Sequence, residues 1–185
     1  SIKWMWVDTL ISGKSGDNIY IEIGEKTSAG VFPLSVSVEK VGELITVKTG
    51  VSEYTVGIDG GLIKKCRYDK RIVIKEGNAN GLYVIDQNGR VGKASAKNAS
   101  MKVESSGPIS AVIRIEGDYR TAEGEDLAHH ITRLKFTAGR PEVEATHTLI
   151  LTRATNEVWF RDIGWEFETS SGVDAKALFS IGDDE

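Results

Sequence analysis

The sequence predicts an all-β protein, either an antiparallel β-sandwich or a barrel-like fold. Apolar and polar residues alternate with a period of two along most of the 185 residues, as expected for strands that bury one face. Asn-Gly and Asp-Gly pairs, which favour tight hairpin turns, separate several of the alternating runs. The best helical candidate, residues 174–179, is too short for a stable helix.

The first half of the chain predicts short strands joined by tight turns. Glycine-containing turns fall at residues 12–16, 59–61, 80–81 and 88–89. The same-face apolar positions of the predicted strands are Trp4 and Trp6; Ile19, Ile21 and Ile23; Val36 and Val38; Ile45 and Val47; Tyr54, Val56 and Ile58; and Ile72 and Ile74.

The second half predicts longer strands and therefore a large sheet. Residues 138–141 contain Gly and Pro and predict a turn between two of them. The same-face positions are Ile109, Ala111, Ile113 and Ile115; Leu134 and Phe136; Val143, Ala145, His147, Leu149 and Leu151; and Trp159, Arg161, Ile163, Trp165 and Phe167.

One stretch of polar and small residues, 90–100, predicts a long loop that could be a seam between two β portions. The chain then divides into residues 1–90 and residues 91–185, or it forms one continuous domain. No repeat with a period of about 20–50 residues is visible, which disfavours propellers and solenoids.

Composition excludes several classes of function. The chain has 23 Lys and Arg residues, 27 Asp and Glu residues and a formal net charge of −4. Because no basic block is present, we expect no nucleic-acid partner. Apolar runs are only a few residues long, whereas a membrane-spanning helix needs about 20 residues, so we expect no membrane partner.

Known signatures of metal and cofactor sites are also missing from the sequence. The single Cys66 cannot form an internal disulfide or a multi-thiolate zinc site. No nucleophile elbow, phosphate loop or His-Glu-x-x-His motif occurs. The acidic residues 183–185 fit a solvated chain end, and Asp59 and Asp86 fit turn positions. We expect no cofactor and no metal.

The three histidines are the residues that titrate nearest neutral pH. His129 and His130 are adjacent in sequence, so they would face opposite sides of a strand, and we interpret them as part of a solvated turn before Ile131. The parity of His147 places it on an apolar face, where we expect a neutral, hydrogen-bonded imidazole. The alternative for His147 is a general base or ligand in a cleft of the sheet.

The four tryptophans cluster towards the two ends of the sequence, at positions 4, 6, 159 and 165. Indole rings stack on the apolar faces of sugars and can donate a hydrogen bond to them, so these residues suggest carbohydrate binding. The competing interpretation is core packing, because Trp159 and Trp165 share parity with Ile163 and Phe167.

Three segments resemble the exo-rhamnogalacturonan lyase and YetA-like family. The first, residues 107–119, begins Gly-Pro and continues as a strand to Gly-Asp-Tyr. The second, residues 133–149, contains Phe-Thr-Ala-Gly-Arg-Pro followed by a strand with His-Thr, and the third is residues 160–165 with Asp-Ile-Gly. The Trp-Met-Trp-Val-Asp start at residues 4–8 extends the resemblance over most of residues 2–167.

The resemblance implies a β-rich portion, of the supersandwich or RIFT-barrel type, from an extracellular or cell-surface protein that acts on pectic polysaccharide. Lyases of this kind perform β-elimination beside a uronic acid, which needs a base and a cation. The family's proteins are longer and contain a helical domain, so the resemblance implies a fragment or a reduced version that is not itself catalytic. The candidates for carbohydrate contact are Trp4, Trp6, Tyr119, Arg133, His147, Trp159 and Trp165.

Two classes of function remain open from the sequence. In the first, the chain is an accessory β domain that supports carbohydrate binding in a pectin-directed protein, and its partners are the polysaccharide or other domains of a larger protein. In the second, it is a structural or adhesion module without enzymatic activity, on a cell surface or a virion appendage. Exposed edge strands could also pair two copies into a homo-oligomer.

Overall fold

The computed structural model describes residues 32–77 and 81–170, and the structural statements below concern these residues. They form twelve β-strands and contain no helix, in two antiparallel sheets. The prediction of an all-β sandwich is therefore confirmed. None of the described segments is an apolar helix of the length needed to cross a membrane.

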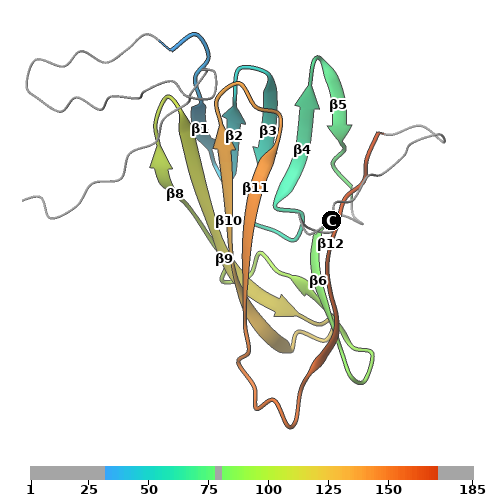
Figure 1. Ribbon diagram of the computed structural model, residues 1–185. Coiled ribbons are helices and arrows are strands. Elements are labelled where there is room, and N and C mark those ends of the chain that lie inside the picture. Colours follow the sequence, from blue (N-terminus) through green and yellow to red (C-terminus); the bar gives the residue numbers. More distant parts are fainter. Residues whose placement is uncertain (1–31, 78–80, 171–185) are drawn as a thin grey trace, which may run out of the picture.

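The first sheet has five strands in simple sequential order (Figure 1). A tight turn at Asp69 and Lys70 joins its last two strands, and both residues have positive φ, 44° and 66°, as a type I′ hairpin turn requires. The strands are β1 (Ser37–Val41), β2 (Leu44–Lys48), β3 (Ser52–Val56), β4 (Ile63–Tyr68) and β5 (Arg71–Ile74).

The second sheet has seven strands in the order β11-β10-β9-β7-β6-β12, and β8 also pairs with β9. Its two longest strands, β9 and β10, form its centre, and β11 and β12 end the path on either side. The strands are β6 (Gly81–Asp86), β7 (Val91–Ala94), β8 (Ser100–Ser106), β9 (Ser110–Arg120), β10 (Asp126–Thr137), β11 (Val143–Ile150) and β12 (Phe160–Glu166).

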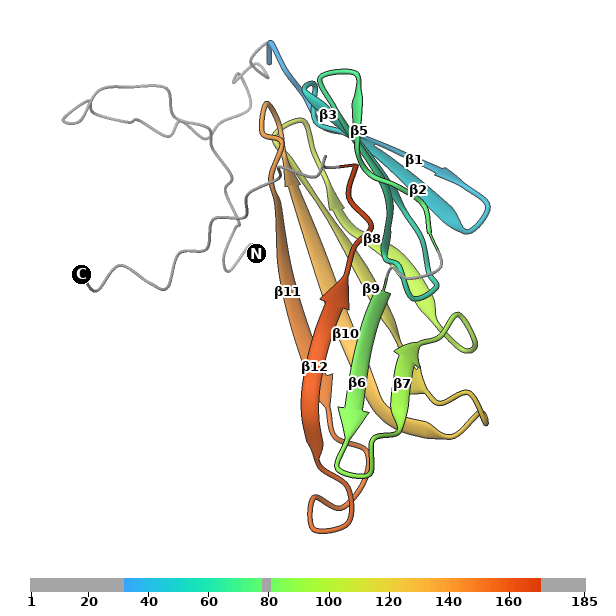
Figure 2. The ribbon, with the colours of Figure 1, turned by 90° about the vertical axis from the view of Figure 1, so that its right-hand side faces the viewer.

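The seven-stranded sheet curls so that it supplies part of both layers of the sandwich. At one end of the molecule β9 and β10 face the five-stranded sheet, whereas at the other end β6, β7 and β12 lie across from them (Figure 2). A Cβ at Gly92 in β7 would lie 3.0 Å from Leu127, 3.2 Å from Val84 and 3.4 Å from Tyr119. The backbone of β7 thus packs directly onto the side chains of this lower end.

The core runs through both ends of the sandwich without interruption. In the upper part, Val47, Tyr54 and Val56 of the five-stranded sheet pack with residues of β9 and β10, and the rings of Tyr54 and Phe136 have centroids 5.1 Å apart. In the lower part, Leu82 and Val84 join Tyr119 and Leu127 in the same buried cluster. Buried positions alternate with less buried ones from Ala111 onward in β9 and from Ala128 onward in β10, which confirms the period-two prediction for these strands.

The middle of the chain, residues 90–100, contains strand β7 and the first residue of β8. Residues 91–94 form strand β7, so the predicted long loop over residues 90–100 is wrong, and the connection to β8 is only residues 95–99. The sequence there is polar because β7 is short and alternates exposed and buried positions. The division considered near residue 90 falls in the turn between β6 and β7, which are paired neighbours of one sheet.

The chain switches sheets after β12. Lys75 donates its backbone N–H to Glu168 O over 2.9 Å, and Ser170 donates to Val73 O over 2.9 Å. Thr169 and Ile74 form an isolated antiparallel bridge between these bonds. The segment that follows β12 therefore covers the edge of β5 and links the two sheets at one corner of the sandwich.

Candidate functional site

The structure distributes the seven candidate residues over separate regions. Tyr119 and His147 lie together on the inner face of the seven-stranded sheet, within hydrogen-bonding distance. Arg133 lies on the outer face of the same sheet. Trp159 precedes β12 and Trp165 lies within it. Trp4 and Trp6 are outside the described residues, so their predicted role stays a prediction.

A chain of hydrogen bonds connects three strands on the inner face. Tyr119 Oη of β9 lies 3.1 Å from His147 Nε2 of β11. His147 Nδ1 lies 2.8 Å from Thr132 Oγ1 of β10, and the same hydroxyl lies 3.2 Å from His130 Nδ1. Thr132 and His147 are directly opposite in the β10–β11 register. We call Tyr119, His147, Thr132 and His130 the histidine chain.

Burial sets the protonation states in the histidine chain. It raises the pKa of Tyr119, which is fully buried, so the phenol stays protonated. It lowers the pKa of His147, and it lowers the pKa of His130 to about 4, with the neighbouring His147 and His129 adding to the effect. Both imidazoles are therefore neutral at pH 7, so each ring has one nitrogen that can donate a hydrogen bond and one that can accept.

The prediction that His129 and His130 form a solvated turn is wrong, because both lie within strand β10. Since successive side chains of a strand face opposite sides, His130 is buried in the interior and His129 projects outward. The outer side chain lies between two carboxylates, with Nδ1 2.7 Å from Asp118 Oδ1 and Nε2 3.1 Å from Glu116 Oε1. The hydrogen bond to Asp118 is the main cause that raises the pKa of His129.

Arg133 is engaged in ion pairs away from the histidine chain. Its Nε and Nη2 donate to the two carboxylate oxygens of Glu104 over 2.8 and 3.1 Å. Glu104 also lies 3.7 Å from Arg114 Nε, which continues a charge ladder across β8, β9 and β10. Because Arg133 and His147 occupy opposite faces, they cannot contact one sugar residue together.

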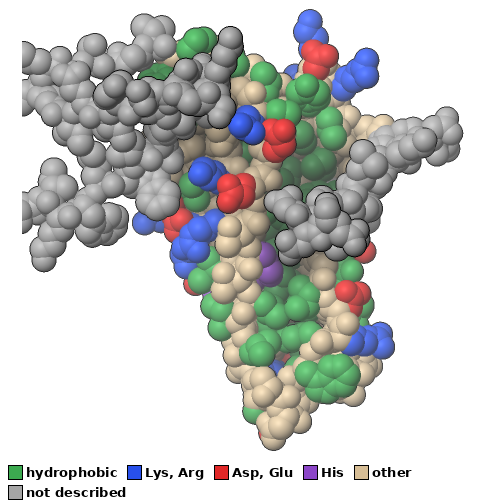
Figure 3. Space-filling model, viewed as in Figure 1, with side chains coloured by type: hydrophobic (Ala, Val, Ile, Leu, Met, Phe, Trp, Pro, Cys, Tyr) green, Lys and Arg blue, Asp and Glu red, His purple; other side chains and the backbone are tan. Residues whose placement is uncertain are grey.

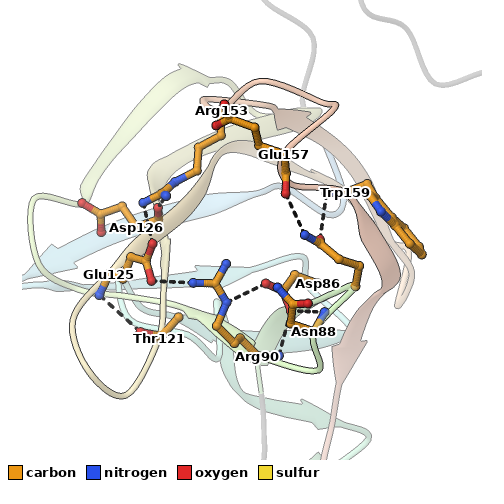
Figure 4. A network of polar contacts seen from close by, with 10 residues as sticks. Asp86, Asn88, Arg90, Thr121, Glu125, Asp126, Arg153, Glu157 and Trp159 are labelled. Carbon is orange, nitrogen blue, oxygen red and sulfur yellow. Dashed lines mark hydrogen bonds and ion pairs between the residues drawn. The ribbon is translucent and has the colours of Figure 1, made fainter.

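Trp159 sits at the lower end of the molecule and is 55% exposed. Gln87 holds its backbone from both sides, since Trp159 N–H donates to Gln87 Oε1 over 3.0 Å and Gln87 N–H donates to Trp159 O over 3.0 Å. Gln87 Nε2 also donates to Glu157 O over 2.7 Å. The indole ring points outward from this network (Figure 4), so the core-packing interpretation is wrong for Trp159.

A buried carboxylate organises the turn beside Trp159 (Figure 4). The Asp86 side chain has no exposed area; its Oδ1 accepts from Asn88 N over 2.9 Å and from Arg90 N over 2.8 Å, and its Oδ2 accepts from Arg90 Nε over 2.7 Å. Burial opposes ionisation of Asp86, but the hydrogen bonds from Arg90 and Asn88 outweigh it and lower its pKa. Arg90 continues to Glu125 over 2.6 Å, and Glu125 pairs with Arg153 over 2.8 Å. The sequence identified Asp86 as a turn residue, but the network of ion pairs needs contacts between segments that pattern analysis does not reveal.

Trp165 has a different environment from Trp159. It packs half-buried against the core on the inner face of β12, and its ring lies 4.7 Å from that of Phe167. Its Nε1 is buried and has no hydrogen-bond partner among the described residues. A bulge between Phe160 and Asp162 reverses the parity of β12, so Phe160 faces the core where the alternation predicted Arg161.

The inner face between β11 and β12 exposes apolar side chains. Figure 3 shows hydrophobic side chains along this face with a histidine among them. Ile163 is 48% exposed although it lies opposite the buried Val84 in the sheet register, and Leu151 is 49% exposed. Among the described residues, no group of three or more His, Cys, Asp or Glu side chains is arranged to hold a metal ion.

A comparison with protein-family models matches residues 36–176 to the central β-sandwich domain of PcRGLX-like proteins. The chain belongs to the PcRGLX-like family. The match includes the three segments that resemble the exo-rhamnogalacturonan lyase and YetA-like family, so that prediction is confirmed. A search of curated proteins finds no match to the PcRGLX-like chain.

Proposed function

We propose that this PcRGLX-like sandwich is a non-catalytic accessory domain that supports carbohydrate binding in a pectin-directed, rhamnogalacturonan lyase-like protein. The observation that carries the proposal is the exposed indole of Trp159, whose backbone Gln87 fixes from both sides. A rigid, exposed aromatic ring binds a sugar face without first losing conformational freedom. The match to a rhamnogalacturonan lyase-like family supports pectic polysaccharide as the substrate class in this proposal.

A non-catalytic role fits the placement of the titratable residues. β-Elimination needs a base near the acidic C–H and a positive group that stabilises the developing charge. His147 has both ring nitrogens engaged within the histidine chain. Arg133, the cationic residue among the carbohydrate-contact candidates, is paired with Glu104 on the opposite face. His147 and Arg133 are therefore separated by the thickness of the sheet.

Charges near Trp159 favour an acidic glycan. The Arg161 guanidinium lies beside the β6–β7 turn, where its Nη2 would be 3.5 Å from a Cβ at Gly89. Arg161 is exposed, and a free guanidinium can bind a carboxylate through two parallel hydrogen bonds. A uronic acid followed by a neutral sugar would place its carboxylate at Arg161 and an apolar sugar face on Trp159.

The apolar face between β11 and β12 supports a second role, in assembly. Ile163, Leu151 and Phe167 are each more than a third exposed, and contiguous apolar surface on a soluble domain marks an interaction site. We propose that this face packs against a neighbouring domain of the same protein, consistent with a domain described as central in its family. We also propose that the protein is extracellular or on the cell surface. Nothing in the comparisons supports the virion alternative.

Calorimetric titration of the chain with rhamnogalacturonan oligosaccharides tests the proposed function. We expect measurable binding that weakens about ten-fold or more in Trp159→Ala, which corresponds to about 1.4 kcal/mol. Tyr68→Ala is the matched control, because Tyr68 is 46% exposed at the other end of the molecule and should bind like wild type. Unchanged binding in Trp159→Ala would overturn the proposed contact.

A second assay addresses the non-catalytic claim. Incubation with the same oligosaccharides should yield no rise in ultraviolet absorbance from unsaturated product. Product formation that disappears in His147→Gln would show that the histidine chain is catalytic and would refute an accessory role.

A further inference from the structure

The histidine chain joins the edge strand β11 to the interior of the seven-stranded sheet. Over the described residues β11 pairs only with β10. Val143 and Leu149 are partly buried against the core, whereas Ala145 is exposed. His147 is the β11 side chain with hydrogen bonds to two other strands, reaching Thr132 in β10 and Tyr119 in β9.

Neutral imidazoles give the hydroxyl protons of Tyr119 and Thr132 an acceptor within the chain. Thr132 Oγ1 lies between two Nδ1 atoms, and a hydroxyl has one proton to donate. If Tyr119 donates to His147 Nε2, then His147 Nδ1–H donates to Thr132 and Thr132 donates to His130 Nδ1. In the opposite direction, His130 Nδ1–H donates to Thr132, Thr132 donates to His147 Nδ1 and His147 Nε2–H donates to Tyr119 Oη, which leaves the Tyr119 hydroxyl proton without an acceptor in the chain. Two imidazolium rings would present N–H donors to both Thr132 and Tyr119, so neither hydroxyl proton would have an acceptor within the chain, and two like charges would lie close together.

The ring geometry adds a direct electrostatic conflict on protonation. The centroids of His130 and His147 are 5.8 Å apart with nearly parallel planes, and Tyr119 lies 5.3 Å from His130. Two positive charges at this distance inside a buried cluster repel each other much more strongly than in water. Protonation of both histidines therefore disfavours the closed arrangement.

We propose that the histidine chain is an acid-sensitive latch, which holds the edge strand β11 on the sheet when it is neutral and releases this strand when its histidines are protonated. Release would expose the edge of β10 and the inner face beside it. The latch is independent of the carbohydrate contact at Trp159, so an experiment that refutes one of these two proposals leaves the other unaffected.

The charged groups around the latch agree with this direction. Besides burial, His147 and His129 lower the pKa of His130, whereas Asp118 and Glu116 of β9 raise it. Those two carboxylates lie on the outer face and are hydrogen-bonded to His129. Burial alone acts on His147. Because both folded-state pKa values lie below that of an unfolded histidine, the stabilisation is complete above about pH 6.5 and is lost as the pH falls towards 4.

Hydrogen exchange of backbone amides at pH 7 and at pH 4.5 tests the latch in the full chain. After correction for intrinsic exchange rates, we expect the protection of β11 amides to fall at least ten-fold at pH 4.5, while Ile45 and Val47 in the five-stranded sheet retain theirs. In His147→Gln, which cannot become charged, the protection of β11 should no longer depend on pH. His129→Gln is the matched control: β11 should still lose protection at pH 4.5, with a somewhat higher midpoint because His129 no longer lowers the pKa of His130.

An NMR titration of the wild-type imidazoles makes the test independent of whether the variants fold. The loss of β11 protection should share its midpoint with the titration of His147 or His130. Equal loss of protection in both sheets would indicate global acid unfolding and would overturn the latch. Unchanged β11 protection at pH 4.5, or a midpoint that follows His129, would also overturn it.

Discussion

Replacing Asp86 by Ala should destabilise the fold more than replacing any exposed Asp or Glu by Ala. The carboxylate has no exposed area and accepts three hydrogen bonds, two from backbone N–H groups and one from the Arg90 guanidinium. Each lost bond that leaves a donor without a partner costs about 1 kcal/mol or more, so we expect a loss of about 3 kcal/mol in the free energy of unfolding. For a chain of this size the melting temperature should fall by about 6–12 °C.

Urea unfolding followed by tryptophan fluorescence measures this loss. Glu53→Ala is the control, because the Glu53 side chain is 38% exposed and its contact with Lys48 is long, 3.7 Å, and its removal should change stability by less than about 0.5 kcal/mol. Since the pKa of Asp86 is lowered by folding, its contribution is present above the unfolded pKa and is lost as the pH falls through the folded value. The two proteins should therefore converge in acid. A loss below about 1 kcal/mol at pH 7 would refute the reasoning that this carboxylate organises the β6–β7 turn.

Three further substitutions test the packing and the outer face. Gly164→Ala should destabilise by about 1–3 kcal/mol, because its Cβ would overlap the Tyr83 ring; the double variant with Tyr83→Ala should show a smaller added cost, and simple additivity would count against the overlap. Phe136→Ala empties a fully buried site in the upper core and should cost about 3–5 kcal/mol in urea unfolding, whereas a loss under 1 kcal/mol would contradict the core assignment. The pKa of His129 is raised by its carboxylate partners, so His129→Gln should lose stability at pH 6 and little at pH 9, and the reverse pH dependence would show that the pairing is absent.

Much of the fold was accessible from the alternation of the sequence. The runs around Ile113, Phe136 and Val47 correspond to buried faces of β9, β10 and β2. Such runs are predictable because a strand with one buried face must repeat its apolar residues every second position. The pairing of β7 with β9, and the curl of the seven-stranded sheet that follows from it, could not be predicted, because β7 is short and its contacts are far apart in sequence.

The candidate site was only partly predictable for two physical reasons. The bulge at Phe160 shifts the parity of β12, so a strict period of two assigns the wrong faces around Trp159. Adjacent histidines suggested a turn, but both lie in β10 and each has hydrogen-bond partners on its own face of the strand. His130 lies inside beside Thr132, and His129 lies outside between two carboxylates. The partners that make each environment acceptable come from β9 and β11 and are not visible from local sequence.

Chemical-shift mapping with a rhamnogalacturonan oligosaccharide tests the central claim most directly. The PcRGLX-like chain, labelled with nitrogen-15, would be titrated with a short oligosaccharide containing a uronic acid. We expect the amides of residues 86–90 and 157–161, together with the Trp159 indole, to shift in a saturable manner, while those of β2 and β3 do not. Absence of any saturable shift, or shifts confined to residues far from Trp159, would contradict the claim that this sandwich supports carbohydrate binding through its lower end.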